Sequence, residues 1–175
     1  MKNLTFISII SVLLMACSST QKAMQYTVIK DSNTTILKGY ISRTILEKDT
    51  TSKWFKENMR YGTPNQEAVN AFAKNKDAFS LIVFGGTWCE DTQNLLPRLY
   101  QLTDKSGFPE NKIQLIAVDQ QKQTILNLHT KYAIQNVPTF IVIQNGKEVG
   151  RVVEYGTIGD ITKELGAIVQ RLSSL

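Results

Sequence analysis

Short runs of apolar and β-branched residues alternate along this chain with longer segments in which apolar residues recur every three or four positions. The first pattern predicts strands, and the second predicts amphipathic helices. The uninterrupted apolar run at residues 81–84 is typical of a strand that is covered on both faces. The predicted strands are residues 26–30, 35–41, 81–84, 113–118, 139–143 and 148–154.

Helices are predicted between most of these strands. Thr63, Pro64 and Gln66 fit a capping box, with threonine as the N-cap and proline as the first helical residue. Pro97 lies inside the next predicted helix, where it predicts a kink. The predicted helices are residues 52–59, a helix opened by the capping box, residues 89–104, residues 125–132 and a closing helix with an apolar stripe between Ile161 and Leu172.

The order of these elements predicts the fold class. A helix between successive strands implies parallel pairing of those strands. Asn145-Gly146 lies between the last two predicted strands and is a strong signal for a two-residue hairpin, which adds antiparallel strands. The sequence therefore predicts an α/β domain with a central mixed β-sheet flanked by helices, preceded by an N-terminal extension.

The first segment has the pattern of a targeting signal. Lys2 precedes an apolar, uncharged stretch at residues 4–15, which is too short to span a bilayer because a spanning helix needs about 20 residues. The tetrapeptide Leu14-Met15-Ala16-Cys17 that ends it resembles the lipobox of bacterial lipoproteins, although Met15 is an unusual residue there.

This resemblance implies a lipoprotein signal peptide at residues 1–16, a lipidated Cys17 and a short tether at residues 17–24. The domain would then be anchored to a membrane of the bacterial cell envelope, facing the periplasm or the exterior. The alternative is an ordinary secretory signal in which Cys17 is incidental.

Composition and charge exclude several functional classes. The 175 residues suffice for one domain with its own core, and we expect a monomer. The net charge is +5, but basic and acidic residues are interspersed, so no nucleic-acid partner is expected. If Cys17 is lipidated, Cys89 is the only free thiol. An internal disulfide is then excluded, and one cysteine with one histidine cannot hold a structural zinc ion, so we expect no metal and no cofactor.

The Trp88-Cys89 pair carries the candidate chemistry. Cys89 opens a predicted helix directly after a buried strand, and the free N–H groups and partial positive charge of a helix N-terminus favour a thiolate. Thr92 lies one turn further on, where we expect its hydroxyl to donate a hydrogen bond to the sulfur. Glu90 and Asp91 oppose the thiolate with negative charge, depending on where they point.

Four features in order resemble the thioredoxin fold. They are the Trp88-Cys89 pair, Pro97 within the following helix, the tripeptide Val137-Pro138-Thr139 before a strand, and the turn Asn145-Gly146-Lys147. The resemblance implies a thioredoxin-like domain at residues 79–175, with residues 25–78 as an N-terminal extension that packs on the core.

The resemblance also implies a binding groove. In this fold a cis-proline loop faces the cysteine and exposes a backbone edge, so Trp88, Val137, Pro138 and Thr139 are the candidate substrate-binding residues, beside Cys89. His129, the single histidine, and Asp119 are weaker candidates for proton transfer, since a lone helical histidine is usually solvated or packed.

Two positions depart from the family pattern. Thr92 stands where thioredoxins have a second cysteine, and Val83 stands where they bury an aspartate. Without a second thiol, a mixed disulfide at Cys89 waits for an external thiol. Two hypotheses follow. One is a monothiol thiol-disulfide oxidoreductase with Cys89 as nucleophile, acting on a client protein or a small thiol or disulfide. The other is a redox-silent module that binds a partner protein through the Pro138 groove.

Overall fold

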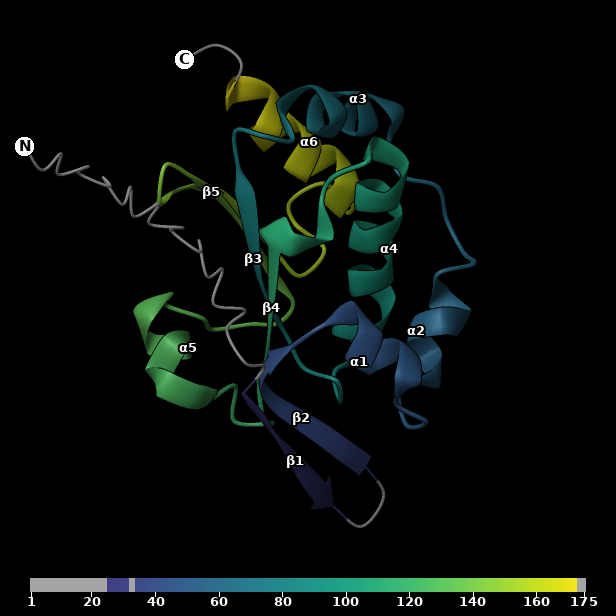
Figure 1. Ribbon diagram of the computed structural model, residues 1–175, viewed down its shortest axis with the longest axis vertical. Coiled ribbons are helices and arrows are strands. Elements are labelled where there is room, and N and C mark those ends of the chain that lie inside the picture. The colour runs from purple at the N-terminus through teal and green to yellow at the C-terminus, as the bar shows by residue number, and fades with distance from the viewer. Residues whose placement is uncertain (1–24, 32–33, 173–175) are drawn as a thin grey trace, which may run out of the picture.

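The computed structural model describes residues 25–31 and 34–172, so the predicted signal peptide, Cys17 and the tether lie outside the described residues. In this part of the chain six strands form one mixed sheet with the order β1-β2-β4-β3-β5-β6 (Figure 1). β3 and β4 are parallel, and each of the other neighbouring pairs is antiparallel. The strands are β1 (Tyr26–Asp31), β2 (Thr34–Ile41), β3 (Ser80–Gly85), β4 (Ile113–Ala117), β5 (Thr139–Gln144) and β6 (Lys147–Val153).

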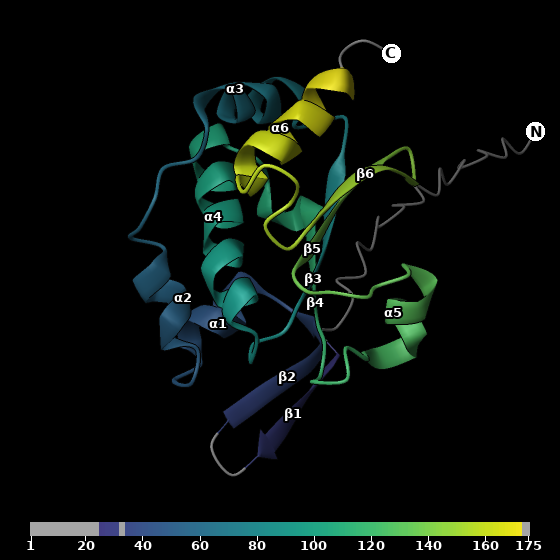
Figure 2. The ribbon, with the colours of Figure 1, turned by 180° about the vertical axis from the view of Figure 1, so that it is seen from behind.

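Helices cover both faces of the sheet, as the sequence predicts. The short helix α5 lies on one face, and the other α-helices lie on the opposite face (Figures 1 and 2). No helix among the described residues is long and apolar enough to cross a bilayer. The helices are α1 (Arg43–Lys48), α2 (Lys53–Asn58), α3 (Gln66–Asn75), α4 (Glu90–Ser106), α5 (Leu128–Lys131) and α6 (Ile161–Arg171), with 3₁₀ turns at Glu110–Lys112 and Ile125–Asn127.

Strand β3 lies in the middle of the core. Leu81 and Val83 pack into the cluster beneath α3, α4 and α6, whereas Ile82 and Phe84 pack into the cluster beneath α5. Successive side chains of a strand point to opposite faces, so a strand covered on both sides needs an uninterrupted apolar sequence. The prediction that this run is a doubly covered strand is confirmed.

Helix α3 begins two residues later than predicted. Its N-cap is Asn65, whose side chain accepts a hydrogen bond from the Ala68 N–H at 3.0 Å. Asparagine is at least as good an N-cap as threonine, so it competes with the predicted cap at Thr63. The predicted box partner Gln66 instead donates to the Asn70 side chain.

Of two predictions toward the C-terminus, the hairpin turn is confirmed and the single helix at residues 125–132 is wrong. Asn145 and Gly146 both have positive φ, at 51° and 76°, as a type I′ hairpin turn between β5 and β6 requires. The helix predicted at residues 125–132 is instead a 3₁₀ turn followed by α5. Leu126 and Asn127 have φ values of 54° and 52°, which interrupt the helical backbone between the two parts.

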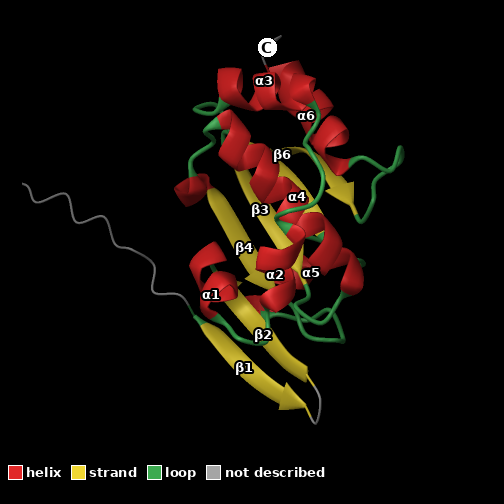
Figure 3. Cartoon of the chain, turned by 90° about the vertical axis from the view of Figure 1, so that its right-hand side faces the viewer, coloured by secondary structure: helices red, strands yellow, loops and turns green. Residues whose placement is uncertain are grey.

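The segment 25–78, predicted as an N-terminal extension, contributes two strands to the sheet and three helices that pack beside it. β1 and β2 form a hairpin at the edge of the sheet, and β2 pairs antiparallel with β4 over its last three residues (Figure 3). The short helix α1 was not predicted; its N-cap Ser42 accepts a hydrogen bond from the Ile45 N–H at 3.3 Å. Figure 1 shows that the β1–β2 hairpin lies at the same end of the molecule as the start of α4.

Candidate active site

Cys89 is the N-cap of α4, immediately after the loop that leaves β3. Its φ and ψ of −88° and 122° are extended, as is usual for an N-cap. The Cys89 N–H donates to the Gly86 carbonyl at 3.0 Å, and its carbonyl accepts from the Gln93 N–H at 3.0 Å. The half-buried thiol is thus fixed at the positive end of a 17-residue helix, where a helix favours negative charge.

The loop at Pro138 lies against this thiol. Cys89 Sγ donates a hydrogen bond to the Val137 carbonyl oxygen at 3.4 Å, and the Val137–Pro138 peptide bond is cis. The Pro138 carbonyl accepts from the Glu154 N–H at 2.7 Å, which ties the loop to the end of β6. The structure therefore brings together the cysteine and the proline that are 49 positions apart in the sequence.

Thr92 is buried and serves a different bond from the one expected. Its hydroxyl oxygen accepts a hydrogen bond from the Gly86 N–H at 3.1 Å, where a hydrogen bond to the Cys89 sulfur was expected. Its methyl group packs so closely against Gly85 that a Cβ added there would lie only 2.9 Å from it. Thr92 thus holds the loop that precedes Cys89.

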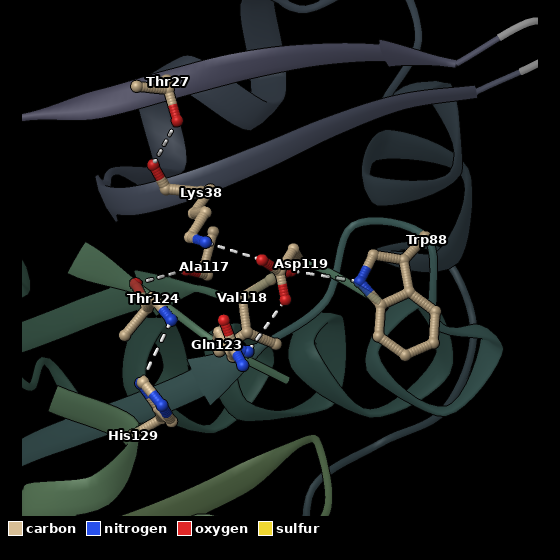
Figure 4. A network of polar contacts seen from close by, with 9 residues as sticks. All are labelled: Thr27, Lys38, Trp88, Ala117, Val118, Asp119, Gln123, Thr124 and His129. Carbon is tan, nitrogen blue, oxygen red and sulfur yellow. Dashed lines mark hydrogen bonds and ion pairs between the residues drawn. The ribbon is translucent and has the colours of Figure 1, made fainter. Parts of the chain in front are cut away.

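Trp88 packs back over this loop. Its indole N–H donates to the Val118 carbonyl at 3.0 Å, beside the end of β4 (Figure 4). A Cβ added at Gly86 would lie 2.7 Å from the indole ring, so the loop needs glycine there to leave room for the ring. Trp88 is half-buried and keeps part of its surface in solvent beside Cys89.

Thr139 and Val137 shape the loop from within. The Thr139 hydroxyl is buried and donates to the Asn136 carbonyl at 2.7 Å, and the Val137 side chain is also buried. Of the Val137-Pro138-Thr139 tripeptide, the group in contact with the thiol is the Val137 carbonyl. A binding role for this loop therefore rests on backbone atoms.

Thr87 was not identified from the sequence. Its buried hydroxyl accepts from the Leu37 N–H at 3.2 Å and donates to the Thr35 carbonyl at 3.5 Å. The Thr87 carbonyl accepts from the Gln93 side chain at 2.8 Å. These bonds join the cysteine loop to strand β2, across about fifty positions of sequence, and no local pattern signals such a long-range contact.

Asp119 forms an ion pair that was also not predicted. Its Oδ2 atom lies 2.6 Å from Lys38 Nζ, and its Oδ1 atom accepts from the Gln123 N–H at 2.8 Å (Figure 4). Burial raises the pKa of Asp119, but the hydrogen bonds from Lys38 and the backbone outweigh it, so its pKa lies below the usual range. An ionised Asp119 closes the loop after β4, next to the Val118 carbonyl that holds Trp88.

His129 is engaged elsewhere. Its Nδ1 atom accepts a hydrogen bond from the Thr124 N–H at 3.2 Å, so this ring nitrogen is occupied by the backbone (Figure 4). Val83 is fully buried, in the strand that leads to the cysteine loop. Among the described residues, no group of three or more His, Cys, Asp or Glu side chains is placed to hold a metal ion. The sulfur that this part of the chain presents at the site is Cys89 Sγ.

Known proteins resemble this chain over its central part. A family model described as Thioredoxin matches residues 62–167. Thioredoxin Y of chloroplasts from Oryza sativa subsp. japonica is 37% identical over 71 residues, which are 41% of this chain and 39% of the relative. Thioredoxin H-type from Fagopyrum esculentum is 31% identical over 90 residues, which are 50% of this chain and 72% of that relative. The match thus spans well under half of the rice protein.

Among solved structures, a protein of unknown function from Pseudomonas aeruginosa aligns over 75% of this chain and 89% of its own chain. The alignment has a TM-score of 0.48 and 16% sequence identity. The family model, in contrast, covers more than half of the 175 residues and includes α3, α4, Cys89 and the cis-proline loop. The chain belongs to the thioredoxin family.

Proposed function

We propose that this protein is a membrane-anchored, monothiol thiol-disulfide oxidoreductase of the bacterial envelope, with Cys89 as its nucleophile. The observation that carries the proposal is the contact between Cys89 Sγ and the Val137 carbonyl beside the cis Pro138 bond, at the N-terminus of α4. A helix N-terminus favours negative charge, which suits a sulfur nucleophile, and the Val137 backbone lies beside this sulfur, where an extended client could pair.

The proposed reaction has two exchange steps. The Cys89 thiolate attacks one sulfur of a client disulfide, the S–S bond breaks, and the leaving client thiolate takes a proton from water. One equivalent of an external thiol then attacks the Cys89 sulfur and releases the second client thiol. A second equivalent attacks the resulting mixed disulfide, which regenerates Cys89 and leaves the external thiol oxidised as its own disulfide.

The reaction needs an external thiol because Thr92 stands where a dithiol protein has its second cysteine. A dithiol protein resolves its mixed disulfide with a neighbouring sulfur at high effective concentration. Here that position carries a hydroxyl already bonded to Gly86, and Cys89 is the free cysteine among the described residues. Turnover should therefore rise in proportion to the concentration of a small thiol.

A turnover assay tests this proposal. Insulin reduction should require both the protein and a monothiol such as glutathione, with a rate first order in each. Cys89→Ser should abolish the protein-dependent rate, while Ser106→Ala, a change at the far end of the same helix, should leave it unchanged. Equal rates for the wild type and Cys89→Ser would refute the oxidoreductase.

The anchor is a separate part of the proposal. It is supported by the lipobox-like Leu14-Met15-Ala16-Cys17 after a short apolar segment. Wild-type protein should partition into the detergent phase of a cloud-point extraction because several acyl chains give stable anchoring. Mature Cys17→Ser protein should move to the aqueous phase; partitioning that survives this change would show that Cys17 is not the anchor.

A second candidate function is a redox-silent module that binds a partner through the Pro138 groove. The observations that favour it are the buried Thr92, whose hydrogen bond is to Gly86 and not to the sulfur, and the fully buried Val83, whose apolar side chain cannot accept a proton. Partner binding that is unchanged in Cys89→Ser, together with no thiol-dependent turnover, would support this module.

A further inference from the structure

Strand β1 is an exposed apolar strand at the edge of the sheet. It is outermost in the strand order, and its side chains from Tyr26 to Lys30 are all exposed. Tyr26, Val28 and Ile29 are 38%, 49% and 39% exposed, so large apolar groups meet solvent on both faces of the hairpin. On one face, Tyr26 and Val28 also line an open groove of about 400 Å³ together with Ile45 of α1. Exposed apolar side chains on a free edge strand favour contact with a partner or a membrane.

The position of Cys17 limits what can cover this strand. Eight residues separate Cys17 from Tyr26, and even a fully extended chain over that distance reaches only about 30 Å. That reach is about twice the radius of gyration of a domain of this size. If Cys17 is held in a bilayer by acyl chains, the start of β1 is therefore kept at the bilayer surface.

We propose that the β1–β2 hairpin is a membrane-contact surface, which lies in the headgroup region of the bilayer that holds the anchor. This inference rests on the proposed lipidation of Cys17. Tyrosine is favoured at the membrane interface, and apolar side chains there are buried beneath the headgroups. The exposed Lys30 and Lys48 flank the apolar residues and suit anionic headgroups. The free edge of β1 keeps water and phosphate oxygens as hydrogen-bond partners at this depth.

The contact would also orient the redox site. Thr87 joins the cysteine loop to β2 through its bonds to Leu37 and Thr35. The hairpin and the start of α4 lie at the same end of the molecule (Figures 1 and 3). With the hairpin on the bilayer, Cys89 faces clients whose cysteines lie close to the membrane surface.

Quenching by brominated lipid tests the contact. Lipidated full-length protein is reconstituted in vesicles of phosphatidylcholine and phosphatidylglycerol, with phosphatidylcholine brominated near the headgroup end of its acyl chains. Tryptophan is introduced by Val28→Trp on β1 or, as the control, by Leu126→Trp, which is 69% exposed before α5. Both sites are exposed, so neither change should disturb folding, and thermal unfolding verifies this.

We expect the emission contributed by Val28→Trp to fall about twofold, since interfacial side chains reach roughly 5–10 Å into the headgroup boundary. Emission contributed by Leu126→Trp should stay unchanged. Vesicle flotation with no more quenching at Val28→Trp than at Leu126→Trp would overturn the hairpin contact but leave the anchor in place, and another protein would then be the cover of β1. Failure of the wild type to float with vesicles would overturn the anchor and, with it, this inference.

Discussion

The Thr92 hydroxyl oxygen accepts a hydrogen bond from the Gly86 backbone N–H at 3.1 Å, one helical turn after Cys89. Thr92 and Gly86 are both buried. The side chain that stands where a dithiol protein has its second sulfur thus fixes the backbone before the first sulfur. The bond between Thr92 and Gly86 therefore ties the first turn of α4 to the loop that precedes Cys89.

Removal of the Thr92 hydroxyl should destabilise the fold. Thr92→Val leaves the buried Gly86 N–H without an acceptor, which should lower the free energy of unfolding by about 1–3 kcal/mol. Thr92→Ser keeps the acceptor and loses only a buried methyl group, which should cost about 1 kcal/mol. Urea unfolding monitored by tryptophan fluorescence measures both changes. A Thr92→Val protein as stable as the wild type would contradict the role given to this bond.

A second sulfur at position 92 should convert the site to a dithiol. Residues three apart at the start of a helix are neighbours, so Thr92→Cys places a thiol within disulfide reach of Cys89. Mild oxidation should form the internal disulfide, and insulin reduction with dithiothreitol should gain multiple turnovers. The buried, apolar Val83 offers no proton acceptor, so the gained rate should be low.

The matched control is Asn94→Cys, an exposed position five residues along the chain from Cys89, which lies on another face of the helix. It should form no internal disulfide. If folded Thr92→Cys protein also forms none, the geometry of the first turn of α4 differs from the one described. If the disulfide forms but no client disulfide is ever reduced, the binding module is favoured.

Acid should weaken the link between the hairpin and the site. Because the pKa of Asp119 is lowered in the folded protein, its pair with Lys38 stabilises the fold above the ordinary value of 3.8. This stability is lost as the pH falls through the lower pKa of the folded state. The difference in unfolding free energy between the wild type and Lys38→Met should therefore be largest near neutral pH and should narrow below 3.8.

Lys30→Met, a change of an exposed lysine on the same hairpin, serves as the control and should follow the wild type at every pH. Urea unfolding between pH 3 and pH 7 measures the three proteins. A gap between Lys38→Met and the wild type that stays constant over this range would contradict the contribution of the ion pair.

Local patterns predicted most of the elements. The apolar run at β3 and the Asn145-Gly146 turn were sufficient, because each depends on neighbouring residues alone. The start of α3 was displaced because Thr63 and Asn65 satisfy the same capping preference. The antiparallel pairing of β2 with β4 depends on contacts between residues that are far apart in sequence, which local periodicity does not encode.

The candidate site was predicted in outline but not in its supporting bonds. The Trp88-Cys89 pair and Pro138 carry recognisable local patterns, and the structure brings Cys89 against the adjoining Val137. The roles of Thr87 and Asp119 depend on partners on β2 that are far away in the sequence, so no local pattern predicts them. The donor to Thr92 lies six residues away, but its identity depends on how the glycine loop folds.

If Cys89 is a nucleophile, its adduct with a disulfide should persist until an external thiol releases it. Intact-mass analysis of folded protein after incubation with oxidised glutathione near pH 7 tests this behaviour. One mixed disulfide per chain should form at Cys89 of the folded protein, and it should be stable on its own and released by added glutathione. Cys89→Ser should form none. An adduct on the wild type that forms only after unfolding would show instead that Cys89 is a structural thiol and not a nucleophile.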